Sequence, residues 1–264
     1  MTQREQPVPQ GTTPCNIVVF GETGAGKSSV INLIVGKDVA ETSSGSTGCT
    51  FNSERYPTEI EGVPLVLWDT SGLNEGNKGK VAGKQAMIQL YELISSLEEE
   101  GVSLLVFCVR GPRIKDTMVN NYQLFHSSFC LGKVPIVLVM TGLEEEEPMD
   151  AWWPQNKGTF QAEEMSFCGQ ACITATKGKL RQGGYTYQDE YDESRKKVRK
   201  LIVDSYQVVP WKLEKVPWFV ASIRRIAKGI AWLVGYRAGD VLVEFLKDYA
   251  GLSEKDADKA AKEE

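Results

Sequence analysis

Five short runs of apolar residues recur along the chain, each with the length of a buried strand. The runs are near-continuous rather than alternating, which indicates burial on both faces, as in a parallel sheet covered by helices. A further strand is expected at residues 55–60, hairpinned antiparallel onto its neighbour through Glu61-Gly62. The five apolar runs are residues 16–20, 63–68, 103–109, 134–140 and 171–175.

Segments with helical spacing of apolar residues lie between these runs. The first follows Ser28 directly and has Gly36 as its expected stop. Alternating strands and helices predict a three-layer α/β fold with a mostly parallel central sheet, and residues 217–248 add C-terminal helices. The helical segments between strands are residues 28–35, 80–99, 116–130 and 188–206.

Composition divides the chain into four parts. Residues 1–14 carry three prolines and are expected to form a flexible arm. Residues 15–210 form the α/β domain, 211–250 a helical extension, and 251–264 a charged tail. The N-terminus lacks an apolar core and no apolar run is long enough to span a bilayer, so we expect neither a secretory signal nor a membrane helix.

Charge and cysteine usage narrow the function classes. The 264 residues are 42% hydrophobic and 25% charged, which is ordinary for a soluble globular protein. The net charge of −5 argues against a nucleic-acid partner, because phosphate neutralisation needs a basic surface. The six cysteines contain no C-x-x-C pair, so we expect free thiols and a cytoplasmic protein.

The most informative motif is the octapeptide Gly-Glu-Thr-Gly-Ala-Gly-Lys-Ser at residues 21–28. It fits G-x-x-x-x-G-K-[ST], lies between an apolar strand and a helix, and can wrap backbone N–H groups around a phosphate. Lys27 would reach the β and γ phosphates, and the Ser28 hydroxyl would ligate Mg²⁺. The residues expected to hold the nucleotide here are Glu22, Thr23, Gly24, Ala25, Gly26, Lys27, Ser28 and Ser29.

Two further segments are expected at the phosphates. Asp69 follows strand 63–68, where an acidic side chain orients Mg²⁺, and the Gly72 N–H can sense the γ-phosphate. The small, polar loop 42–50 can close when a threonine hydroxyl ligates Mg²⁺. Thr50 is the first choice and Thr47 the second. Lys27, Thr50 and Gly72 are therefore the candidate catalytic residues, and Ser28, Thr50 and Asp69 the candidate metal ligands.

With these motifs the chain resembles the P-loop GTPases of the translation-factor-related class, in the branch of septins, AIG1-type immune-associated GTPases and chloroplast Toc receptors. It looks more narrowly like single-domain G proteins of basidiomycete fungi. The resemblance covers about residues 15–210. The segments that carry it are residues 21–34, 68–73, 110–116 and 141–147.

The resemblance implies that the segment after strand 134–140 reads guanine. Thr141 stands at the first position of the family's [NT]-K-x-D motif, Gly142 replaces its lysine, and Glu144 takes the acidic position, with Glu145 as the alternative. The Glu144 carboxylate would accept hydrogen bonds from guanine N1 and N2. The family's last motif, with a backbone N–H aimed at guanine O6, falls on Thr174, Ala175 and Thr176.

The expected activity is Mg²⁺-dependent GTP binding with slow hydrolysis to GDP, as a switch or assembly unit. Hydrolysis is expected to be slow because Leu73 stands where many GTPases place a glutamine that orients water. Arg110, Arg113 and Lys115 would supply charge across a homodimer at the nucleotide face, or form surface salt bridges.

Three matters stay open. A non-hydrolysing GTP-dependent scaffold and a P-loop ATPase or kinase are the rival functions. The basic amphipathic stretch 217–234 fits packing on the α/β domain and equally a membrane or partner contact, which would make the protein peripheral to a membrane.

Overall fold

The fold is known from a computed structural model, which describes residues 14–41, 54–70, 92–93, 96–97, 99–111, 116–212 and 243. The N-terminal arm up to residue 13, loop 42–50, most of the predicted helix 80–99, the C-terminal helices and the tail lie outside these residues. No helix among the described residues is long and apolar enough to cross a membrane.

The predicted α/β architecture with a mostly parallel sheet is confirmed. Six strands pair in the order β2-β3-β1-β4-β5-β6. All neighbours run parallel except β2 and β3, the predicted antiparallel hairpin. The carboxyl ends of the parallel strands therefore meet at one edge, where α/β sheets bind ligands. The strands are β1 (Cys15–Gly21), β2 (Glu54–Ile60), β3 (Val63–Asp69), β4 (Leu104–Arg110), β5 (Ile136–Thr141) and β6 (Gly169–Cys172).

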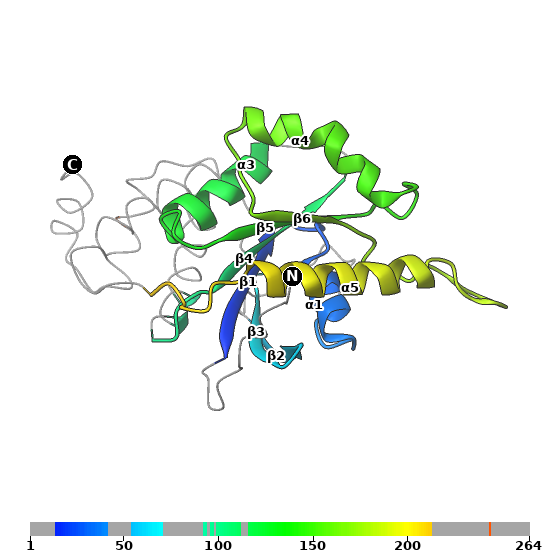
Figure 1. The fold of residues 1–264 in the computed structure, drawn as a ribbon, viewed down its shortest axis with the longest axis horizontal. Helices are drawn as coiled ribbons and strands as arrows, with labels where there is room; N and C mark the ends of the chain where they lie inside the picture. Colours follow the sequence, from blue (N-terminus) through cyan, green and yellow to red (C-terminus); the bar gives the residue numbers. More distant parts are fainter. Residues whose placement is uncertain are drawn as a thin grey trace, which may run out of the picture.

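Helices cover both faces of this sheet. α1 (Lys27–Val35) and α5 (Gln188–Ser205) lie on one face, while α3 (Asp116–Tyr122) and α4 (Trp152–Ala162) lie on the other (Figure 1). α1 ends at Gly36, whose φ of 81° and N–H bond to the Asn32 carbonyl form the predicted C-cap.

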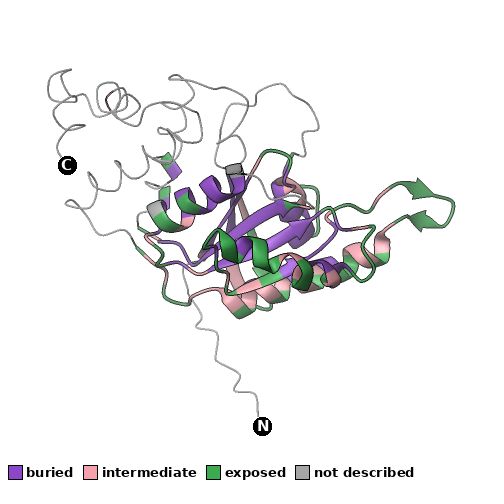
Figure 2. Cartoon of the chain, turned by 90° about the horizontal axis from the view of Figure 1, so that it is seen from above, coloured by how far each residue is buried: buried purple, intermediate pink, exposed green. Residues whose placement is uncertain are grey.

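The alternation of side chains along each strand explains how one sheet contributes to two hydrophobic cores, one on each face. Val18 and Phe20 of β1 face the α3 side, where Phe20 stacks on Phe125 with ring centroids 4.4 Å apart. Ile17 and Val19 face the α1 side. Successive side chains of a strand point to opposite faces, so burial on both sides needs apolar residues at every position. Figure 2 shows the central strands buried along most of their length.

Several boundaries differ from the sequence prediction. β6 begins at Gly169 and ends at Cys172, before the predicted end at 175. The predicted helix 116–130 is α3 followed by a π-helical segment, Gln123–Phe129, whose wider turn brings Leu124, Phe125 and Phe129 into the core. Three elements were missed: α4 with its preceding 3-10 turn (Met149–Ala151), and the exposed hairpin of β7 (Leu180–Arg181) and β8 (Gly184–Tyr185).

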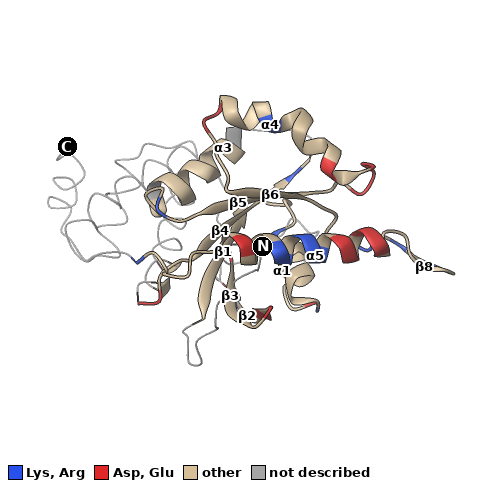
Figure 3. Cartoon of the chain, in the orientation of Figure 1, with Lys and Arg blue, Asp and Glu red and all other residues tan. Residues whose placement is uncertain are grey.

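Arginines of α5 hold the end of α1 and the β2–β3 hairpin together. Arg195 donates from Nε to the Leu33 carbonyl at 3.1 Å. Arg199 donates from Nη1 to the Ile34 carbonyl at 2.8 Å and from Nη2 to the Glu59 carbonyl at 3.1 Å. The last carbonyls of a helix lack intrahelical partners and carry partial negative charge, so cations stabilise them. The charged residues of α5 are visible in Figure 3.

Candidate functional site

The glycine-rich turn between β1 and α1 is built around its own lysine. Lys27 is only 6% exposed, and its Nζ donates to the Gly21 and Glu22 carbonyls at 3.0 Å each. Gly26 caps α1 with a left-handed φ of 86°, and the Ala25 N–H donates to the Glu22 carbonyl at 3.1 Å. The turn therefore curls back on its strand and presents the first N–H groups of α1 at the carboxyl edge of the sheet.

Ser28 and Asp69 come together from two different elements. The Ser28 hydroxyl, in the first turn of α1, donates to Asp69 Oδ2 at 2.9 Å. Asp69 ends β3 and is 4% exposed. Thr70, the next residue, is tied to β1 because its N–H and hydroxyl both donate to the Val19 carbonyl. Two of the three predicted metal ligands are thus adjacent.

Thr141 fastens the turn to the other half of the sheet. Its hydroxyl donates to the Ala25 carbonyl at 2.8 Å, and its side chain is buried. Its own carbonyl accepts the Gly111 N–H at 3.1 Å, so the ends of β4 and β5 are joined at the same place. A Cβ on Gly26 would lie 3.3 Å from Thr141 Oγ1. The sequence placed Thr141 beside the base, and in the structure its hydroxyl is directed to the glycine-rich turn.

The two neighbouring glutamates that follow have different surroundings. Glu144 is half-buried, and its Oε2 is a buried acceptor that has no hydrogen-bond partner among the described residues. Glu145 is exposed and accepts a hydrogen bond from the Tyr187 hydroxyl. An unpartnered buried carboxylate oxygen is costly, which favours an external donor there. Of the two predicted carboxylates, Glu144 is therefore the better placed to take a ligand.

The loop after β6 leaves one backbone donor available. The Thr174 N–H donates to Ser194 Oγ at 3.1 Å, and the Thr176 N–H donates to the Thr174 hydroxyl at 3.3 Å. Among the described residues, nothing accepts from the Ala175 N–H. Ala175 is therefore the member of the predicted trio whose backbone can still donate.

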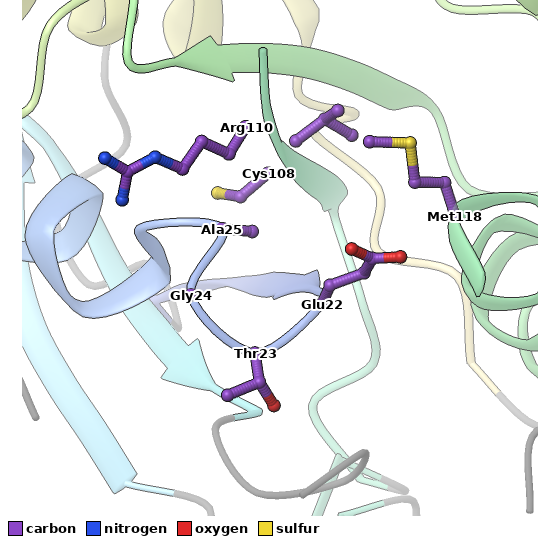
Figure 4. A pocket seen from close by; sticks show the side chains of 8 residues that line it. Glu22, Thr23, Gly24, Ala25, Cys108, Arg110 and Met118 are labelled. Carbon is purple, nitrogen blue, oxygen red and sulfur yellow. The ribbon is translucent and has the colours of Figure 1, made fainter. Parts of the chain in front are cut away.

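A cavity of about 180 Å³ borders the turn on the side of β4. Figure 4 shows Glu22, Thr23, Gly24 and Ala25 along it, with Cys108 and Arg110 above and Met118 at one side. Burial raises the pKa of the Cys108 thiol to about 12, so this thiol stays protonated at neutral pH and is a poor nucleophile. All five described cysteines are free.

Several predicted site residues lie outside the described part of the chain. They are Thr47, Thr50, Gly72, Leu73, Arg113 and Lys115. Within the described part, no group of three or more His, Cys, Asp or Glu side chains could hold a metal ion by itself. The Ser28–Asp69 pair fits Mg²⁺, which binds through one or two protein ligands and fills its other positions with water and substrate phosphates.

Residues 16–141, just under half of the chain, match the family model described as 50S ribosome-binding GTPase. This match accords with the strand order and the glycine-rich turn, and it gives these residues the fold of a P-loop GTPase domain.

Relatives resemble only part of the chain. Immune-associated nucleotide-binding protein 10 of Arabidopsis thaliana is 28% identical over 163 residues, 58% of this chain and 34% of that protein. GTP-binding protein A of Dictyostelium discoideum is 33% identical over 81 residues, 31% of this chain and 17% of that protein. The chain thus spans about a third or less of the length of these curated relatives.

Among solved structures, Era of Aquifex aeolicus bound to GDP and AlF4⁻ aligns with a TM-score of 0.47 at 20% identity, covering 80% of this chain and 65% of that one. Toc33 of Arabidopsis thaliana in complex with Mg²⁺ and GMPPNP aligns with a TM-score of 0.44 at 14% identity, covering 74% and 88%.

The Thr141–Ala25 hydrogen bond can be tested through stability. Thr141→Val keeps the shape of the side chain and removes the buried donor, so the free energy of unfolding should fall by about 1 kcal/mol. Denaturant unfolding followed by tryptophan fluorescence measures it. Thr186→Val is the matched control, because the Thr186 hydroxyl donates to the Lys179 carbonyl at the surface and should matter little. Equal losses in both variants would contradict an anchoring role for Thr141.

Proposed function

We propose that this protein binds GTP and GDP with Mg²⁺, hydrolyses GTP slowly and acts as a switch or assembly unit in the cytoplasm. The observation that carries the proposal is the hydrogen bond between Ser28 and Asp69, next to the buried Lys27. A hydroxyl from the first helical turn and a carboxylate from the adjacent strand offer oxygen ligands beside a cradle of N–H groups. The family match itself suggests guanine-nucleotide binding.

Each residue of the turn has a role in this proposal. The N–H groups at the start of α1 and the Lys27 ammonium bind the phosphates and oppose their negative charge, which grows on the oxygens during transfer. Ser28 and Asp69 hold the metal ion, which when bound supplies positive charge to the β and γ phosphate oxygens. Residues 42–50 and 71–72 lie outside the described residues, and we propose them as the segments that respond to the γ-phosphate.

Guanine recognition is assigned to the carboxyl ends of β5 and β6. The buried Glu144 oxygen suits the adjacent N1 and N2 donors of guanine, which adenine does not offer. The Ala175 N–H would donate to O6. This pairing of one carboxylate and one backbone donor supports a guanine nucleotide over the rival ATP.

Removing the lysine of the turn tests nucleotide binding directly. Lys27→Ala should weaken GDP binding roughly a hundredfold or more, because a charge-assisted contact to the phosphates is lost. Calorimetric titration of the purified protein measures the affinity. Lys133→Ala is the control, since Lys133 is an exposed cation in the turn before β5. If Lys27→Ala keeps its affinity for GDP, the assignment of the turn is wrong. If ATP competes for the site as strongly as GTP does, the assignment to guanine nucleotides is wrong.

The difference between the two glutamates gives a second test. Glu144→Gln should weaken GDP binding roughly tenfold or more, because the amide accepts more weakly than a carboxylate. Glu145→Gln should change the affinity less than about twofold, as its partner is the Tyr187 hydroxyl. Competition against a fluorescent guanine nucleotide distinguishes them. The reverse order would assign base recognition to Glu145.

Hydrolysis is tested by single turnover. Bound GTP should convert to GDP at a rate on the order of 10⁻³ s⁻¹ or below in dilute protein. A higher rate per protomer at high protein concentration is expected if a homodimer forms across the nucleotide face. Separation of GTP and GDP by ion-exchange chromatography after quenching gives both rates. A rate that stays at the uncatalysed background at both concentrations would favour the non-hydrolysing scaffold.

A further inference from the structure

Arg110 and Gly142 are in close contact at the edge of the candidate site. The register pairs Arg110, the last residue of β4, with Thr141 of β5. Gly142 follows with a φ of 77°, and a Cβ placed there would lie 3.3 Å from Arg110 Cγ and 3.4 Å from Arg110 Nε. The stem and the first guanidinium nitrogen of Arg110 therefore run close beside the place where a side chain at position 142 would begin.

Arg110 lies near the two parts of the proposed nucleotide site, the glycine-rich turn and the segment that contains Glu144. Arg110 borders the same cavity as Gly24 and Ala25 of the phosphate-binding turn. Gly142, beneath its stem, is two residues before Glu144 with its buried unpartnered oxygen. In Figure 4 the Arg110 side chain extends above the turn, away from Glu22 and Met118. Arg110 thus borders the turn assigned to the phosphates and lies next to Gly142, which begins the segment assigned to the base.

The guanidinium itself is uncommitted. Arg110 is exposed, and within the described residues it forms no hydrogen bond and no ion pair. A guanidinium is planar, weakly hydrated and stacks on aromatic faces, including nucleobases. A side chain at position 142 would need a left-handed backbone and would be in tight contact with Arg110, so glycine at this position lets the arginine lie here without strain.

We propose that Arg110 covers the guanine ring in the same protomer, next to Gly142, which has no side chain of its own to do so. This rests on the proposed function, because it presumes that the site binds a guanine nucleotide. It assigns Arg110 a contact with the base rather than with phosphates of a neighbouring protomer. The arginine then contributes to the affinity for nucleosides and not to the affinity for bare phosphates.

A ligand without a base separates these roles. Arg110→Ala should weaken GDP binding roughly tenfold, as expected for one lost stacking contact, and leave the affinity for inorganic pyrophosphate within about twofold. Calorimetric titrations of dilute protein with GDP and with pyrophosphate measure both. Arg181→Ala, an exposed arginine in the β7–β8 hairpin, is the control and should change neither affinity. An unchanged melting temperature establishes that Arg110→Ala is folded.

Three outcomes would overturn the inference. Equal weakening of GDP and pyrophosphate binding would make Arg110 a phosphate contact. Unchanged GDP affinity in dilute protein, with slower hydrolysis only at high concentration, would assign it to a partner protomer. Unchanged GDP affinity and hydrolysis would leave it without a role. If the unsubstituted protein fails to bind GDP, the proposed function itself is wrong. If the unsubstituted protein binds GDP and Arg110→Ala binds it equally well, only the inference about Arg110 is wrong.

Discussion

The hydrogen bond from the Thr141 hydroxyl to the Ala25 carbonyl is the contact on which the geometry of the site depends. The glycine-rich turn is attached to the sheet through β1 and continues into α1, and within it Lys27 and the Ala25 N–H donate to carbonyls of the turn itself. Thr141 fixes that middle to the end of β5, while the Ser28–Asp69 bond fixes the start of α1 to the end of β3. Strands on both sides of β1 thereby position one loop, which is how a parallel sheet can hold a site rigidly at its carboxyl edge.

Close backbone approach makes this arrangement compatible with only some residues. A Cβ on Gly21 would lie 2.1 Å from the Cys108 carbonyl oxygen, so the chain can turn out of β1 beside β4 only without a side chain there. The thiol of Cys108 fills the buried space behind the turn. The first glycine of the motif at 21–28 is therefore required by the packing of β1 against β4, whatever the turn binds.

The sequence predicted the elements whose signals are local. Apolar runs located β1, β3, β4 and β5, and the motif spacing located Lys27, Ser28 and Asp69. The sequence did not predict α4, because this segment contains Pro154 and Gly158 and buries only Trp152 and Phe160, too few apolar residues for a helical pattern. The helix forms nonetheless, since proline is tolerated in a first helical turn. The β7–β8 hairpin has two-residue strands that bury nothing, so it leaves no periodic pattern. The hydrogen bond from Thr141 to Ala25 and the close approach of Arg110 to Gly142 depend on strand register, which no short motif encodes.

The close approach of the side chain at position 110 to the backbone at position 142 has a consequence for related sequences. A Cβ at 142 would lie 3.3 Å from Cγ and 3.4 Å from Nε of Arg110, so a side chain at 142 and a long one at 110 crowd each other beside the end of β5. Related chains should therefore vary at these two positions together: a residue with a stem at 142 should accompany a small one at 110, and a glycine at 142 a long one.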